Sequence, residues 1–126
     1  MNKRKVDDMI PFAFDSLKEA NIVNKKGEIN KNYRGQISSF GAAIAMGSLA
    51  AAVAFFSDKG SAEVHREYLI KAIESVISKS NGEEIDNLYK YVVDNKASSK
   101  CREEILNASM AIKLAMNLYK LVEGEK

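Results

Sequence analysis

The sequence has very few of the residues that form covalent or metal-bound cross-links. It contains a single cysteine, Cys101, and a single histidine, His65. One cysteine excludes an intrachain disulfide framework, and one cysteine with one histidine cannot by themselves complete a zinc site. One proline and seven glycines among 126 residues, with 46% apolar and 29% charged residues, are ordinary for a compact helical protein. The composition predicts a single helical domain, residues 1–126, without a cofactor or a metal site.

Reaction motifs are scarce as well. Gly47-Ser48 lacks the flanking glycines of a nucleophile elbow, and Lys59-Gly60-Ser61 lacks those of a phosphate loop. His65 lies in a charged stretch and is expected to face solvent. Cys101 lies on an apolar stripe and is expected to be a small core residue rather than a reactive thiol. The sequence therefore predicts no catalytic residues and a protein that is not an enzyme but presents surfaces.

Charge gives a weak indication of partners. The net charge is +2, and the basic excess lies at the front of the chain, where residues 1–34 hold eight Lys or Arg against five acids. A solvated face of mixed charges is the usual explanation for such a balance. Lys3, Arg4 and Lys5 are followed by Asp7 and Asp8, where a signal peptide would need an apolar run. We therefore expect a cytoplasmic protein.

One stretch organises the chain, and it runs from Tyr33 to Lys59. Residues 35–57 carry no charge and include seven alanines, which favour a helix. Large apolar residues fall on every side of the helical wheel, so such a helix must be covered all round, either by other helices of the chain or by lipid. Gln36 and three serines weigh against lipid. The prediction is a long, buried central helix.

Apolar residues at helical spacing indicate four further helices, over Lys5–Ile22, Ala62–Lys79, Glu83–Asp94 and Ser99–Glu123. Asp7 or Asp8 is expected to cap the first of them, Gly60 and Ser61 to separate the second from the central helix, and Asn81-Gly82 to end it. Segments 24–32 and 95–99 are expected to be connections, and no window alternates as a strand would. The predicted fold is all-α, a single compact bundle of about five helices around a long, alanine-rich central helix.

Two parts of the sequence carry a family resemblance. Tyr33-Arg34 opens the central stretch, which continues through Gly47-Ser48-Leu49 to the segment 54–60, Ala-Phe-Phe-Ser-Asp-Lys-Gly. The segment 114–120, Leu-Ala-Met-Asn-Leu-Tyr-Lys, closes the chain's last predicted helix. Together they resemble the small helical subunit of the type III-B (Cmr) CRISPR effector complex. Two positions depart from that family: Gly41 stands where it often has proline, and Leu118 where tryptophan is common.

The resemblance implies a non-catalytic, RNA-binding subunit of a ribonucleoprotein complex for antiviral defence. It implies partners of three kinds: the duplex of guide RNA and target RNA, other subunits of the Cmr complex, and copies of the chain itself in a stack. The subunit would flank the groove in which target RNA pairs with the guide. Such a role needs lysines and arginines that contact the RNA backbone, because base pairing reads the sequence.

The candidate RNA-binding residues are five cations. Three of them match family positions, and two are neighbours on polar helical faces: Arg34, Lys59 and Lys120, with Arg66 and Lys113. Each of them is also explained by solvation, and a lysine at a helix C-terminus complements the macrodipole. Tyr33 is expected to pack in the core at the helix entry rather than to stack on a base.

Two other functions are compatible with the sequence. A helical adaptor would oligomerise through the apolar faces of its last helix and bind only proteins. A small membrane-inserting protein would use residues 35–57 as its span. RNA binding that weakens as the salt concentration rises would distinguish the RNA-binding subunit from the adaptor. A requirement for detergent would identify the membrane-inserting protein.

Overall fold

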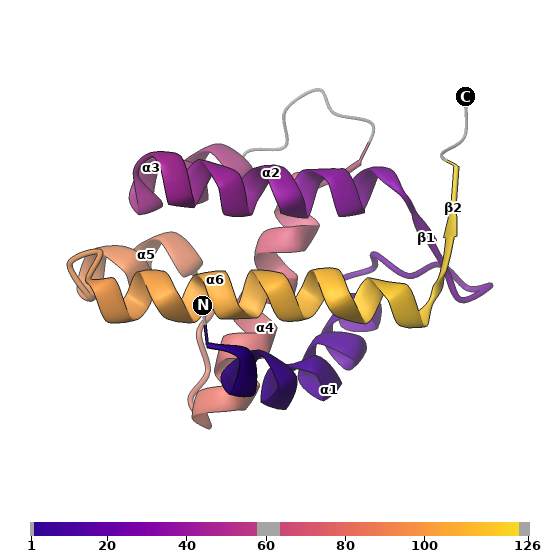
Figure 1. Cartoon of the computed structure of the whole chain (residues 1–126), viewed down its shortest axis with the longest axis horizontal. Helices are drawn as coiled ribbons and strands as arrows, with labels where there is room; N and C mark the ends of the chain where they lie inside the picture. Colours follow the sequence, from indigo (N-terminus) through magenta and orange to yellow (C-terminus); the bar gives the residue numbers. More distant parts are fainter. Residues whose placement is uncertain (1, 58–63, 124–126) are drawn as a thin grey trace.

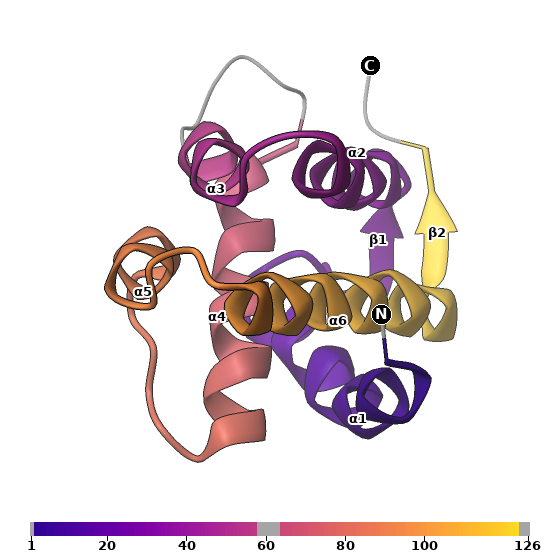
Figure 2. The ribbon, with the colours of Figure 1, turned by 60° about the vertical axis from the view of Figure 1, so that its left-hand side comes forward.

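The computed structural model describes residues 2–57 and 64–123, and most of them are helical (Figure 1). The elements in chain order are α1 (Lys3–Glu19), β1 (Glu28–Asn30), α2 (Asn32–Met46), α3 (Leu49–Ser57), α4 (Arg66–Asn81), α5 (Leu88–Asp94), α6 (Ser99–Ala115), the short 3₁₀ helix η1 (Met116–Leu118) and β2 (Lys120–Val122). Helix α6 runs through the middle of the molecule, α2 and α3 lie on one side of it, α1 lies on the other, and α4 crosses behind (Figures 1 and 2). The predicted all-α fold class is confirmed.

The core is apolar and draws on all of these layers. Leu17 of α1, Phe40 of α2, Ile73 of α4 and Ile112 of α6 are each at most 1% exposed. A half-buried polar contact joins α1 to α4, where the Ser16 hydroxyl donates to the Ser75 hydroxyl at 2.9 Å. Among residues 2–57 and 64–123, none of the helices has both the length and the apolar character needed to cross a bilayer.

The predicted long central helix is in fact two helices. α2 ends at Met46, Gly47 has a non-helical backbone with φ −143° and ψ −140°, and α3 begins at Leu49. The Ser48 hydroxyl accepts a hydrogen bond from the Ala51 amide at 3.2 Å, as a helix cap does. Helix propensity predicted continuity through the alanines, but the Gly-Ser pair supplies both a stop and a start. The predicted end, at Lys59 and Gly60, lies outside the described residues.

The expectation that this stretch is covered all round is also wrong. Ile37, Phe40 and Ile44 of α2 are buried, but Met46 is 88% exposed and Phe55 of α3 is 60% exposed. Alanines on the same helices are exposed too, so one face of α2 and α3 is apolar and open to solvent. The two helices therefore bury a stripe each, and the rest of their apolar surface is available to a partner.

A pair of parallel strands was not predicted. β1 lies in the connection that follows α1, β2 follows η1, and the register pairs Glu28 with Lys120, Ile29 with Leu121 and Asn30 with Val122 (Figure 2). α6 ends at Ala115, whereas the predicted helix continued to Glu123. Three-residue strands leave no alternation in the sequence, and their pairing joins segments that are far apart along the chain.

Other boundaries shift by a few residues for local reasons. α1 begins at Lys3 because the Asn2 side chain accepts from the Lys5 amide at 3.2 Å, so neither Asp7 nor Asp8 is the cap. It ends at Glu19 rather than at Ile22, and Asn21 has a left-handed backbone conformation with φ 64°.

The third and fourth predicted helices are shorter at their starts. α4 begins at Arg66, after a non-helical His65, rather than at Ala62. It ends at Asn81 rather than at Lys79, and the left-handed Gly82 of the predicted Asn81-Gly82 stop follows it. α5 begins only at Leu88, where the Asn87 side chain accepts from the amide of Lys90 at 2.9 Å. The expected Gly60 and Ser61 boundary is not among the described residues.

Candidate nucleic-acid interface

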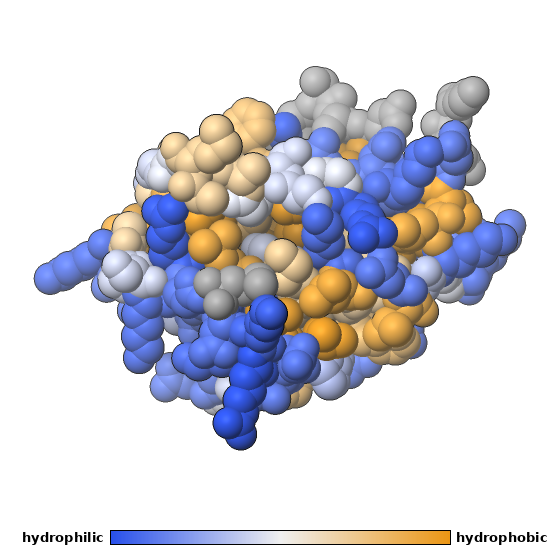
Figure 3. All heavy atoms as spheres, viewed as in Figure 1, coloured by the Kyte–Doolittle hydropathy of each residue, from blue (hydrophilic) through white to orange (hydrophobic). Residues whose placement is uncertain are grey.

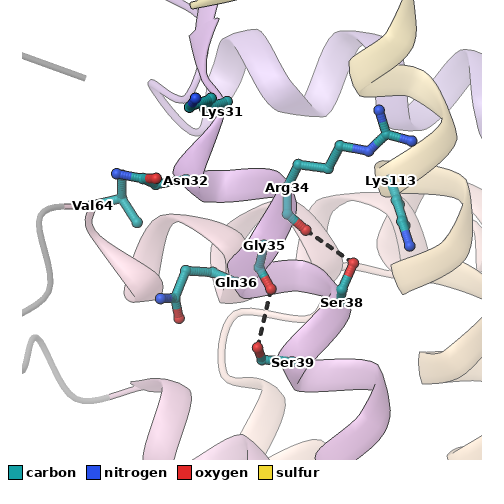
Figure 4. Close-up of a pocket in the computed structure, with 9 residues that line it drawn as sticks. All are labelled: Lys31, Asn32, Arg34, Gly35, Gln36, Ser38, Ser39, Val64 and Lys113. Carbon is teal, nitrogen blue, oxygen red and sulfur yellow. Dashed lines mark hydrogen bonds between the residues drawn. The ribbon is translucent and has the colours of Figure 1, made fainter. Parts of the chain in front are cut away.

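The start of α2 borders an open hollow of about 790 Å³ (Figure 4). Most of its lining comes from this helix and the residue before it, one residue comes from the segment before α4, and one from α6: Lys31, Asn32, Arg34, Gly35, Gln36, Ser38, Ser39, Val64 and Lys113. The Arg34 side chain extends from α2 toward α6, where Lys113 lies (Figure 4). We call this feature the basic hollow.

The strand pair places the start of α2 at the hollow. The Lys31 amide donates to the carbonyl of Val122 at 2.8 Å, which continues the β1–β2 pairing by one residue. The Asn30 side chain then accepts from the Asn32 amide at 2.9 Å and supports the first turn. Gly35 also lines the hollow and contributes no side chain to it. The chain thus enters α2 with Lys31 and Arg34 on the rim.

Two serines on the lining are held by their own helix. The Ser38 hydroxyl donates to the Arg34 carbonyl at 3.0 Å, and the Ser39 hydroxyl donates to the Gly35 carbonyl at 3.1 Å (Figure 4). Their oxygens keep free lone pairs, and the neighbouring Gln36 side chain can donate through its amide. The hollow therefore presents neutral hydrogen-bonding groups between its cations.

The charged side chains in the described lining of the hollow are all cations. Lys31, Arg34 and Lys113 line it, and no acidic side chain is part of its lining among residues 2–57 and 64–123. The first turn of α2 has no acidic residue either, so the partial positive charge of the helix N-terminus is not offset locally. Lys31 does form an ion pair with Glu123, and this contact lowers the pKa of the Glu123 carboxyl. That pair is exposed, so it restrains Lys31 only weakly.

The sequence matches one family model over residues 11–116, and the family is described as CRISPR-associated protein (Cas_Cmr5). The chain belongs to the Cmr5 family. Membership makes it a CRISPR-associated subunit that associates with other subunits of the Cmr complex, and it confirms the resemblance seen in the sequence. Comparison with curated proteins and with solved structures gave no match.

Two of the five candidate cations of this Cmr5-family chain meet in the basic hollow. Arg34 and Lys113 are far apart in sequence and line it together, and both are half-buried. Lys31 completes the set, although it is not one of the five candidates. The only signal for it was the basic excess of residues 1–34, because its position depends on the unpredicted strand pair.

Of the other three candidates, the two that the structure describes do not line the hollow. Lys120 is exposed on β2, where its register partner is Glu28. The guanidinium carbon of Arg66 lies 4.4 Å from the centre of the Phe55 ring and 5.8 Å from that of Phe56, which is cation–π geometry. Arg66 is half-buried there, so a packing role accounts for it. Lys59 lies outside the described residues.

Three further side chains of the Cmr5-family chain lie where the sequence predicted. Tyr33 is 6% exposed, its hydroxyl accepts from the His65 amide at 3.3 Å, and burial raises the pKa of that phenol. The His65 ring is exposed, 3.4 Å from a Glu67 carboxylate oxygen. Cys101 is 4% exposed, and burial raises the pKa of its thiol, so it is a core residue.

Proposed function

We propose that the chain is a non-catalytic, RNA-binding structural subunit of a type III-B Cmr complex, and that its basic hollow contacts the backbone of the guide–target RNA duplex. One observation carries the proposal. Three cations, one just before α2, one on α2 and one on α6, line one open hollow, and no acidic residue takes part in the described lining. Family membership supplies the complex in which such a surface would meet RNA.

The chemistry of the hollow suits a phosphate backbone better than base edges. Lysine and arginine neutralise phosphates without reading sequence, and in an RNA-guided complex base pairing carries the specificity. Between the cations, the Gln36 amide can donate to a phosphate or ribose oxygen, and the Ser38 and Ser39 oxygens can accept from a ribose 2′-hydroxyl. Binding would therefore depend strongly on salt and little on the RNA sequence.

Neighbouring contacts would add to the hollow. Copies of the chain stacked along the RNA, and the adjoining subunits, would share the duplex, so each copy needs only a few phosphate contacts. Lys59 and Lys120 stay candidates for such outer contacts. Lys31 would exchange its exposed ion pair with Glu123 for a phosphate.

The test is photo-crosslinking in the reconstituted complex. The chain is assembled with the other Cmr subunits, guide RNA and a target RNA that carries 4-thiouridine, and the yield of its crosslink to RNA is measured. For Lys31→Ala with Arg34→Ala, two cations that line the basic hollow only, we expect the yield to fall several-fold, and the salt dependence of RNA binding to weaken by about one unit of slope per lost contact. A second target sequence should show the same loss.

A matched control removes two exposed lysines that line none of the hollows described here. Lys71→Ala with Lys90→Ala changes the net charge equally and should leave the crosslink unchanged. An equal loss of crosslink yield in both double variants would show that the effect comes from net charge and not from the basic hollow. A chain that assembles but does not crosslink to RNA would instead favour the protein-binding adaptor.

A further inference from the structure

A second surface of the molecule, distinct from the basic hollow, is an apolar groove between α2 and α6. The two helices lie side by side and run in opposite directions (Figure 1). The groove has a volume of about 360 Å³ and is lined mostly by apolar side chains of both: Ile37, Ser38, Gly41, Ala42, Ala45, Leu106, Ser109, Met110 and Lys113. Figure 3 views this side of the molecule, where apolar surface lies between charged side chains.

The groove exists because α2 has small residues where it faces α6. Gly41, Ala42 and Ala45 are exposed or half-exposed, and they leave Leu106 and Met110 only partly covered. A Cβ added at Gly41 would meet nothing within 4 Å apart from the local backbone of its own helix, so no other part of the described chain fills this space. Polar side chains at these exposed positions would cost no folding free energy. An apolar hollow on the protein surface is therefore typical of a binding site.

We infer that this groove is a docking site for an acidic, amphipathic helix of a neighbouring Cmr subunit. The inference rests on family membership, which gives the chain partner subunits. It does not depend on RNA binding at the basic hollow. The inference excludes two other occupants, a second copy of the chain and RNA.

The walls of the groove favour a helix as occupant. Both walls are helices whose backbone groups are bonded internally, so an extended strand would leave its own amides and carbonyls unpaired. A helix satisfies its own backbone and needs only side-chain contact. Ile37 and Ala45 are eight residues apart, which is about 12 Å or two turns, and that length accepts apolar anchors at i, i+4 and i+7. Small residues on α2 let the backbone of the guest approach closely.

The lining disfavours RNA. Single-stranded nucleic acids are bound on aromatic rings beside cations, and the groove offers Ile, Leu, Met, Ala and Gly instead. A duplex would keep its bases stacked inside and could not use an apolar slot at all. The groove and the basic hollow share only Ser38 and Lys113, so they are adjacent but chemically different.

Charge at the two ends of the groove specifies an acidic guest. Lys113 stands at one end, and at the other the Arg102 guanidinium donates to the Ala45 carbonyl at 3.1 Å. These two cations are about three helical turns apart on α6 and so lie on the same side of it. In the described part of the chain, no acidic residue belongs to the groove lining. Carboxylates flanking the apolar anchors of the guest would pair with both ends.

The first experiment identifies the occupant directly. A photo-crosslinking amino acid is placed at position 42 in the groove, and in a second sample at position 43, which is exposed on the same helix but does not line the groove. Each chain is assembled with the other Cmr subunits and guide RNA, irradiated, and its crosslinked peptides are identified by mass spectrometry. We expect position 42, and not position 43, to crosslink to a helical, acid-rich segment of another subunit.

A crosslink from position 42 to a second copy of the chain, or to RNA, would overturn the inference. So would equal yields at the two positions. Neither result bears on the crosslink between target RNA and the basic hollow, so failure here is distinguishable from failure of the proposed function.

The second experiment tests the sign of the charge. Purified Cmr complex that lacks this chain is titrated with labelled variants, and the concentration for half-maximal incorporation is measured. Ala42→Glu should raise it by about tenfold or more, Ala42→Lys by less, and Ala43→Glu not at all. Equal losses for Glu and Lys at position 42 would contradict an acidic guest. An unchanged thermal melting curve for each variant would show that the chain still folds.

Discussion

At the residue scale, Glu74 is a carboxylate with opposed influences on its charge. It is half-buried on α4, and its Oε2 accepts a hydrogen bond at 2.7 Å from the amide of Leu88, the first residue of α5. Burial raises the pKa of Glu74 above its usual 4.5, the Leu88 bond lowers it, nearby Asp86 raises it and Lys71 lowers it. The net direction is upward, so burial outweighs the bond that holds the two helices together.

This direction fixes the sign of a pH effect. A carboxyl whose pKa is raised by folding binds its proton more tightly in the folded state, so its contribution to stability falls as pH rises above 4.5. Glu74→Gln keeps an acceptor for the Leu88 amide but cannot ionise. We predict that its free energy of unfolding increases relative to that of the parent chain as pH rises above 4.5. Urea unfolding of both proteins between pH 4 and 7.5 measures the difference. A difference that is constant with pH, or that shrinks, would contradict the prediction.

At the scale of elements, the break between α2 and α3 shows how one residue sets a helix direction. A Cβ at Gly47 would lie 3.1 Å from the Ala43 carbonyl oxygen, a backbone atom that cannot turn away. The break also lets Phe56 of α3 fold back onto Phe40 of α2, with their ring centres 5.1 Å apart. Glycine therefore permits the close approach that the two helices need.

Two alanine substitutions on this stretch should have opposite effects. We predict that Gly47→Ala lowers the free energy of unfolding by about 1 kcal/mol, because the contact with Ala43 forces a shift. Gly35→Ala, where a Cβ meets nothing within 4 Å, should raise it by about 0.5–1 kcal/mol through helix propensity. Chemical denaturation measures both. If Gly47→Ala also stabilised the protein, the break would owe nothing to glycine.

Local signals account for what could be predicted at this scale. The Asn81-Gly82 stop of α4 and the Ser99 start of α6 were read from the sequence because the signal and the element are adjacent along the chain. The β1–β2 pair could not be predicted, because three-residue strands carry no periodicity and their partners are remote. The same limit applies to the site: the sequence indicates Arg34 and Lys113 one at a time, and only the folded chain brings them together and adds Lys31.

At the scale of the whole molecule, the segment after α6 closes the fold against α1. The Tyr119 ring stacks on Phe14 of α1, with ring centres 4.6 Å apart, and its hydroxyl donates to the Phe14 carbonyl at 2.8 Å. Lys18 adds a cation 4.9 Å from the centre of the Phe14 ring. Tyr119 directly precedes β2, whose last residue accepts from the amide of Lys31 at the basic hollow. The contact with α1 therefore also positions the entry to α2.

Substitutions at position 119 separate the two parts of this contact. Tyr119→Phe loses one hydrogen bond and should cost about 1 kcal/mol of unfolding free energy, whereas Tyr119→Ala also loses the stack and should cost about 2–3 kcal/mol. Leu118→Ala is the control, because Leu118 is 62% exposed and its loss should stay within about 0.5 kcal/mol. Because β2 depends on this anchor, Tyr119→Ala should also weaken the RNA crosslink at the basic hollow while leaving the position 42 crosslink in place. A Tyr119→Ala protein as stable as the Leu118→Ala control would show that the ends of the chain close without this ring.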